Sequence, residues 1–213
     1  MKGTTHLAIG IAIGAVTAAQ YPFSPKSTSL YLAVSAFSAL SADLDGPSML
    51  SSKISKLSRS LRNFLLWSGF IATSILIYQY FSLGVFYPEY TAASLALFML
   101  GLLTSEGMLR NTLISGIGGG FIYAALLWQM PWLLGLGVFI AIAPWLKHRG
   151  MTHTVWAVIA WGLIGQGLEQ QLQLPGMMTA ATLGYLSHLI ADTLTPSGVK
   201  WLYPIYKKPF KLP

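Results

Sequence analysis

Histidine and aspartate, which bind divalent metals through nitrogen and oxygen, gather in short polar segments of this chain. The 213 residues include only four histidines, and 54% of the chain is hydrophobic while 9% is charged. Seven side chains are candidate metal ligands: His6, Asp43, Asp45, His148, His153, His188 and Asp192. Ionisable groups in so apolar a chain are costly and are usually retained for function. The pattern therefore predicts a metal-dependent active site.

The number of donors bears on how many ions the site holds. One zinc ion takes three or four protein ligands, so seven donors predict two ions, or one ion whose ligands are supported by the remaining residues. Paired metal ions are common in phosphoester hydrolysis. Cysteine is absent, so the ligands must be nitrogen and oxygen. These suit zinc, the metal we favour, and also manganese, iron(II) and magnesium.

The spacing of the donors fits this chemistry. His188 and Asp192 are four residues apart and would share one face of a helix. Asp43 and Asp45 stand just before a Gly-Pro pair, where an irregular helix end would let both carboxylates face one site. Each pair also has a simpler interpretation, an interfacial histidine or a solvated helix end, and the combination of all four segments favours metal.

The third segment, from His148 to His153, holds two histidines around Gly150, which permits a tight turn. Thr152 is expected to cap the following helix with its hydroxyl. Arg149 stands between the histidines, and a guanidinium binds phosphate with two hydrogen bonds. We assign Arg149 to the substrate phosphate, with a simple charge that orients the chain in the membrane as the alternative.

These residues suggest a reaction in which metal-activated water attacks phosphorus. Asp45 would be the general base if it is not a ligand, and Arg149 would offset charge on the phosphoryl oxygens. The side chains expected to bind substrate are Arg149, Thr152, Thr195 and Ser197. A structural turn is an equal alternative for the segment that holds Thr195 and Ser197.

The composition predicts an integral membrane protein, since soluble domains carry about 25% charged residues. We expect an all-α, polytopic helical bundle in one domain, residues 1–213. Apolar segments predict about eight helices, near 5–20, 30–43, 63–82, 91–105, 112–129, 132–147, 152–168 and 177–193. Glycines such as Gly10, Gly14 and those from 116 to 120 are expected to pack helices closely.

The basic residues predict the topology. With a cytoplasmic N-terminus and eight crossings, all of the 13 lysines and arginines except Lys26 would lie inside. This bias follows the positive-inside rule, puts both termini in the cytoplasm, and explains the net charge of +7 without nucleic acid. The same topology places all four polar segments at the cytoplasmic face. Residues 53–62 read either as an amphipathic helix on anionic lipid or as a charge cluster that orients the chain.

The motifs resemble a known family. They are Thr-x-His at the N-terminus, Asp-x-Asp-Gly after the second helix, His-Arg-x-x-Thr-His, and a final His-x-x-x-Asp-x-x-Thr-Pro-x-Gly. This order resembles the bacterial YdjM-like family, described as LexA-binding, inner-membrane-associated proteins of metal-dependent hydrolase type. The resemblance implies an inner-membrane location. A more distant similarity to zinc-dependent phospholipase C, in which His-x-x-x-Asp pairs bind metal, implies phosphoester chemistry.

The function expected is hydrolysis of a phosphoester, in a lipid or lipid-linked substrate, at the cytoplasmic membrane face. The partners expected are membrane lipids and that substrate, without nucleic acid; the sequence leaves the oligomeric state open. One alternative is a metal- or proton-coupled transporter, although such sites usually lie near the bilayer midplane. Another is a non-catalytic stress or scaffold protein with a structural metal, which a closed four-ligand site would support.

Overall fold

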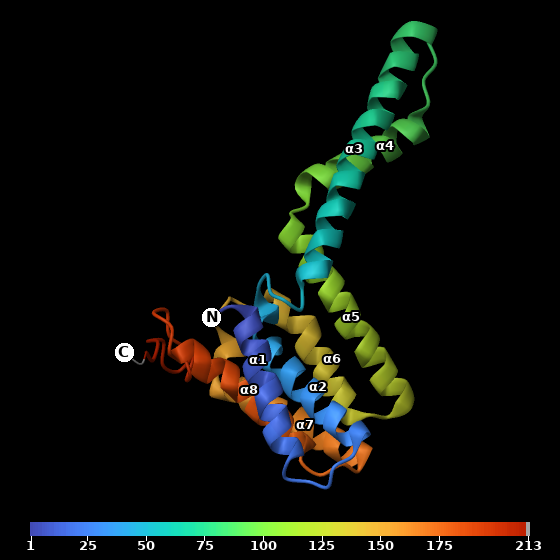
Figure 1. The fold of residues 1–213 in the computed structure, drawn as a ribbon. Helices are drawn as coiled ribbons and strands as arrows, with labels where there is room; N and C mark the ends of the chain where they lie inside the picture. Colours follow the sequence, from blue (N-terminus) through green and yellow to red (C-terminus); the bar gives the residue numbers. More distant parts are fainter. Residues whose placement is uncertain (212–213) are drawn as a thin grey trace. The chain divides into compact units, whose positions relative to one another are not determined.

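The computed structural model describes residues 1–211, and these form eight α-helices (Figure 1). They are α1 (Gly3–Ala18), α2 (Pro25–Ser41), α3 (Ser52–Leu83), α4 (Pro88–Leu103), α5 (Glu106–Trp128), α6 (Pro131–Ile142), α7 (Val155–Leu172) and α8 (Met177–Thr193). Three short 3₁₀ helices are η1 (Ala42–Asp45), η2 (Ala143–Trp145) and η3 (Met151–His153). The predicted all-α class and number of helices are confirmed.

Helix starts follow the chemistry of proline. Pro25, Pro88 and Pro131 each occupy the first turn of a helix, where the missing N–H costs no hydrogen bond. The main difference from the predicted boundaries concerns α3, which begins at Ser52 and runs for 32 residues. The basic segment 53–62 is helical, but it continues directly into the apolar helix instead of forming a separate element.

The chain divides into two compact units, one of residues 52–113 and one of residues 1–51 with 114–211. The prediction of a single domain over 1–213 remains a prediction. In the smaller unit, α3 packs against α4. A Cβ added at Gly69 would lie 2.3 Å from the amide nitrogen of Phe98, and one at Gly101 would lie 2.4 Å from that of Leu66. Glycine is therefore required for this close approach.

Two helices, α3 and α5, are long and apolar enough to cross a membrane by length and composition. Shorter apolar helices cover 3–18, 88–103 and 131–145. Large apolar side chains of α3 are exposed, among them Phe64, Trp67 and Phe81. Such a surface would be unfavourable in water, and it matches the low charge content of the sequence.

In the larger unit, α8 packs against α1, α2 and α7, and α6 packs against α7. Trp161 and Tyr185 stack in the buried core between α7 and α8. The indole N–H of Trp161 donates to the hydroxyl of Ser38 over 2.7 Å. Gly10 and Gly14 bring α1 onto α2 as predicted, because added Cβ atoms would lie 2.8 Å from atoms of that helix. This packing fixes the positions of α1, α2, α7 and α8 relative to one another.

The glycines from 116 to 120 pack less closely than predicted. A Cβ at Gly118 would lie 2.5 Å from the amide nitrogen of Ala141, whereas Gly116, Gly119 and Gly120 meet no atom within 4 Å in the described chain. One glycine of the run therefore accounts for the contact with α6, and the close-packing prediction is wrong for the other three.

Gly184 gives a direct test of helix packing. An added Cβ would lie 2.5 Å from the carbonyl oxygen of Ser35, so Gly184→Ala is expected to destabilise the protein by about 1–3 kcal/mol. Gly120→Ala is the matched control, because its added methyl group is unobstructed and alanine favours helix. Thermal unfolding in detergent compares the two variants. Equal stabilities would contradict the close α2–α8 contact.

Candidate metal centre

Four separate segments of the larger unit bring the predicted donors together. His6 comes from the first turns of α1, the two aspartates from η1, two histidines from the segment before α7, and the last pair from α8. Ligand atoms lie within 4.8 Å of one another in three groups: His6 with Asp43 and His188; His153 with His188 and Asp192; Asp43 with Asp45 and His148. All seven predicted donors therefore belong to one cluster.

Local backbone geometry positions these side chains. After α2 the chain tightens into η1, which turns Asp43 and Asp45 toward the cluster. Between the histidines, the left-handed residue is Arg149, with φ of 56°, and not the predicted Gly150. Gly150 is needed for a different reason, since a Cβ there would lie 2.6 Å from the carbonyl oxygen of Lys147.

The centre of the cluster holds four acceptor atoms. His188 Nε2 lies 3.4 Å from Asp43 Oδ1 and 3.8 Å from Asp192 Oδ2. His153 Nε2 lies 3.6 Å and 3.8 Å from the same two oxygens. Both ring nitrogens are buried and have no hydrogen-bond partner among residues 1–211. Two imidazoles and two carboxylates therefore face one small space.

The tautomers of the two histidines follow from their other ring nitrogens. Nδ1 of His188 donates to the carbonyl oxygen of Ala39 over 2.7 Å, so a neutral ring carries its lone pair on Nε2. The hydroxyl of Thr152 donates to Asp45 Oδ2 over 2.7 Å, and its oxygen therefore accepts from Nδ1 of His153 over 2.9 Å. When both rings are neutral, their Nε2 lone pairs therefore point at carboxylates, which is unfavourable unless a proton or a metal cation lies between them.

The spacing suits a metal ion better than hydrogen bonds. Separations of 3.4–3.8 Å are longer than the 2.7–3.2 Å of ordinary N–H···O bonds. Tetrahedral ligands about 2.0–2.1 Å from zinc lie roughly 3.3–3.4 Å apart, close to the observed values. The donor set of His153, His188, Asp43 and Asp192 therefore fits a divalent cation.

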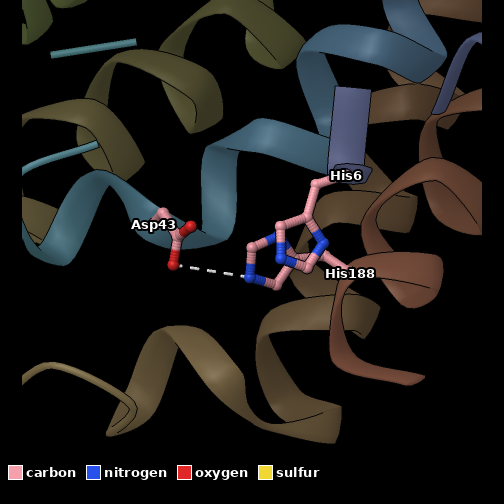
Figure 2. Close-up of side chains that lie close together, drawn as sticks. All are labelled: His6, Asp43 and His188. Carbon is pink, nitrogen blue, oxygen red and sulfur yellow. Dashed lines mark ion pairs between the residues drawn. The ribbon is translucent and has the colours of Figure 1, made fainter. Parts of the chain in front are cut away.

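His6 adds a fifth donor beside this set. Its ring stacks on that of His188 with centroids 3.8 Å apart (Figure 2). Its Nε2 lies 3.4 Å from Asp192 Oδ1, and neither ring nitrogen has a hydrogen-bond partner in the described chain. The Met1 amino group donates to the same oxygen over 2.7 Å. Asp192 thus presents one oxygen to His6 and the other to the central set, an arrangement that could bridge two cations.

The carboxylate of Asp45 is surrounded by hydrogen-bond donors. Its oxygens accept from His148 Nδ1 (2.7 Å), the Arg149 backbone N–H (3.0 Å) and the Thr152 hydroxyl (2.7 Å). Burial raises the pKa of Asp45, but the hydrogen bond from His148, the nearby His153 ring and the hydrogen bond from Thr152 together outweigh burial and lower the pKa to about 2. A carboxylate so well satisfied is suited to holding the segment of Arg149 and Thr152 in place. Its role as base or ligand remains a prediction.

His148 lies at the rim of the cluster. Its side chain is 56% exposed, whereas those of His153 and His188 are fully buried. The hydrogen bond to Asp45 raises the pKa of His148. The ring also packs over Gly46, where an added Cβ would lie 3.4 Å from Nδ1. His148 is therefore the predicted ligand most accessible to a substrate.

The predicted substrate-binding residues differ in their surroundings. Arg149 binds Asp192 Oδ2 over 3.0 Å, and its Nη1 also approaches the Thr195 hydroxyl and the Gly198 carbonyl oxygen. This guanidinium thus holds a ligand carboxylate, and its proposed contact with phosphate remains a prediction. Ser197 is exposed in the turn after α8 and has no contact with the cluster in the described residues.

Thr152 has a different role from the predicted helix cap. Thr154 caps α7, accepting a hydrogen bond from the amide of Ala157, while Thr152 links Asp45 to His153. The hydroxyl of Tyr185, which sequence reasoning missed, donates to the Thr152 carbonyl oxygen over 2.6 Å. Nothing in the sequence marked this tyrosine, because its partner is a backbone atom 33 residues away.

A pH dependence follows from the buried His153. Burial lowers its pKa, but the carboxylates of Asp43 and Asp45 outweigh burial and raise it to about 9 in the metal-free protein. A metal ligand must be neutral, so metal binding near pH 7 is expected to release about one proton from His153 and to weaken as pH falls. Calorimetric zinc titrations in buffers of different ionisation enthalpy measure this release. Affinity that does not change between about pH 6 and pH 8 would contradict the assignment.

The metal-free protein is expected to show the opposite trend in stability. Because the folded pKa of His153 exceeds its ordinary value of about 6.5, protonated His153 stabilises the fold fully below that pH. This contribution is lost as pH rises through about 9. Thermal unfolding of chelator-treated protein across this range measures the effect.

Comparison with known proteins places this cluster in a family. The model of the family described as YdjM inner membrane protein matches residues 1–213. The chain belongs to the YdjM family. Two curated proteins named Inner membrane protein YdjM, from Escherichia coli (strain K12) and Shigella flexneri, are each 38% identical over 78 residues. This match covers 31% of the chain and 34% of each relative, so the chain spans about a third of the length of the curated relatives it matches.

No solved structure matches the chain. Membership of the YdjM family places the protein in the bacterial inner membrane, as the composition and the apolar helices indicate. The family description names a location and no reaction, so the chemistry of the cluster has to be argued from its geometry.

Proposed function

We propose that this YdjM family member is a metal-dependent hydrolase of a phosphoester, carried by a lipid or lipid-linked substrate. The observation that carries the proposal is the set of four acceptors formed by His153, His188, Asp43 and Asp192. Their separations of 3.4–3.8 Å and the absence of a hydrogen on either facing ring nitrogen in the neutral tautomers fit a divalent cation, with zinc favoured.

A divalent cation bound there would lower the pKa of a coordinated water and offset charge on a phosphoryl group. The chain itself supplies orientation. Ala39 and Thr152 fix the ring tautomers of His188 and His153, Asp45 holds the segment from His148 to Thr152, and Arg149 neutralises part of the charge on Asp192. His148, at the exposed rim, could exchange a proton with a substrate leaving group.

The proposed lipid character of the substrate has two supports. The protein is a membrane protein, and basic residues at 147 and 149 flank the exposed His148. In addition, an apolar hollow of about 550 Å³ lies between α6 and α7, and its lining includes Leu146, which directly precedes this segment. A hydrocarbon chain could occupy the hollow, since its volume lies within the range of small-molecule pockets.

A structural metal is the second candidate function, because three of the four central residues are almost fully buried and four protein ligands are the number that a structural zinc site takes. The exposed part of Asp43 favours catalysis over this alternative. Transport is less favoured, since the donors gather at the ends of helices and in the segments joining them, and not within a broken helix.

The test combines metal analysis of protein purified without chelators with phosphatase and phosphodiesterase assays. We expect stoichiometric metal and metal-dependent hydrolysis, both reduced in Asp192→Ala. Metal that stays bound without turnover of any phosphoester would favour the structural candidate. If the protein holds no metal and binds none when supplied, both candidates fail.

A further inference from the structure

Access to the central set is confined to one of its members. His153 and His188 are fully buried and Asp192 is 2% exposed, whereas the side chain of Asp43 is 23% exposed. A molecule that reaches the four acceptors from outside must therefore approach along Asp43. The surroundings of this carboxylate determine which chemical groups can enter.

Asp43 lies in a cleft of about 370 Å³, between the start of α1 and the turn after η1. Lys2 and Thr4 line it on one side and Ser48 on the other. The larger hollow between α6 and α7 is lined by apolar residues and holds none of the seven donors. The Asp43 cleft, in contrast, combines a cationic side chain and hydroxyl groups with access to the metal cluster.

The start of α1 adds further donors to this cleft. The amides of Gly3 and Thr4, at the first two helical positions, have no backbone partner in the part of the chain that the structure describes, and Lys2 provides no side-chain cap. Free amides and the helix dipole favour an anion at such a terminus. Asp43, which lines the cleft, also lies 3.4–3.6 Å from the buried Nε2 atoms of His188 and His153. These two nitrogens have no hydrogen-bond partner among residues 1–211, and they are the independent sign that a ligand belongs beside the cleft.

We propose that this cleft binds the phosphoryl group of the substrate, with Lys2 and the α1 amides of Gly3 and Thr4 holding its non-bridging oxygens. The inference rests on the proposed function and assigns it a binding residue, Lys2. Phosphorus would then lie beside Asp43, on the accessible side of the cluster. A negative group beside a carboxylate is repelled unless a cation intervenes, so phosphate binding should require the metal.

Binding of inorganic phosphate to the full-length, metal-loaded protein in detergent tests the proposal. Lys2→Ala is expected to weaken phosphate binding about 10-fold, the scale of one charge-assisted hydrogen bond, with unchanged metal content. Lys2→Arg is expected to retain binding. Lys26→Ala, which removes an exposed lysine from the start of α2, is the matched control and should bind as wild type does.

Manganese loading supplies a measurement that does not depend on turnover. Enhanced ³¹P relaxation of phosphate is expected in the wild type and in Lys26→Ala, and a reduced effect in Lys2→Ala. A short-chain phosphatidate in place of inorganic phosphate distinguishes the two sources of the phosphoryl group. Tighter binding of the phosphatidate indicates a lipid headgroup, and equal binding indicates a free phosphate; both support the cleft.

The inference and the proposed function fail in different ways. If the metal-loaded protein binds no phosphate, or if Lys2→Ala binds it as tightly as the wild type, the cleft is not the phosphoryl site. Neither result removes the metal centre. Absence of bound metal in the wild type would instead overturn the proposed function, and strong phosphate binding to metal-free protein would overturn the requirement for a cation.

Discussion

His188→Ala is expected to lose its bound metal, with an affinity at least about 100-fold below that of the wild type. The substitution removes one of four central donors, leaves two carboxylates and one imidazole, and also breaks the hydrogen bond to the carbonyl of Ala39. Metal content after dialysis and competition with a fluorescent chelator measure the loss. Hydrolysis of any phosphoester should fall in parallel.

His148→Ala is the informative comparison for this experiment. The ring lies at the exposed rim and its Nδ1 is used by Asp45, so this variant should keep most of its metal. Equal metal loss in both variants would show that the ion lies toward Asp45 and not among the four central acceptors. Thermal unfolding of both variants with chelator present separates loss of a ligand from loss of the fold.

Thr152→Val is expected to weaken metal binding about 10- to 100-fold, although Thr152 is not itself one of the proposed ligands. Valine preserves the shape of the side chain but removes the acceptor for His153 Nδ1 and the donor to Asp45. The His153 ring would lose the hydrogen bond that keeps its lone pair on Nε2. Chelator competition over a range of pH measures the change.

Thr152→Ser restores the hydroxyl and should recover most of the affinity. If the role of Thr152 were purely structural, Thr152→Val and Thr152→Ser would change the unfolding temperature and would leave the metal affinity of the folded protein unchanged. Recovery by serine, together with an altered pH profile in the valine variant, would identify Thr152 as a positioning residue for His153.

Most of the fold could be predicted from the sequence, because apolar runs broken by proline determine where helices begin and end. Prolines at 25, 88 and 131 mark three helix starts. Helix boundaries are harder to predict where charged residues interrupt an apolar segment but the helix continues through them. Residues 53–62 are basic and lie on the same continuous helix as the apolar residues that follow. Charge controls where a segment lies in a membrane, but it does not end a helix.

The cluster was predictable as a set of residue types, and its internal organisation was not. The spacing of His188 and Asp192 placed them on one helix face, as found. Which donors face the centre depends on backbone partners such as the Ala39 carbonyl, which carry no sequence signal. The ion pair between Arg149 and Asp192 also carries no sequence signal, because the two residues lie far apart in the chain. The sequence indicated a metal-binding role for Asp192 and no contact with Arg149.

The stacked rings of His6 and His188 join the first helix of the chain to the last. A nascent chain cannot complete this site until α8 has been synthesised and has docked against α1. The proposed metal could therefore be bound only after the last helix has docked on the first, so a bound ion would report that these two helices had come together.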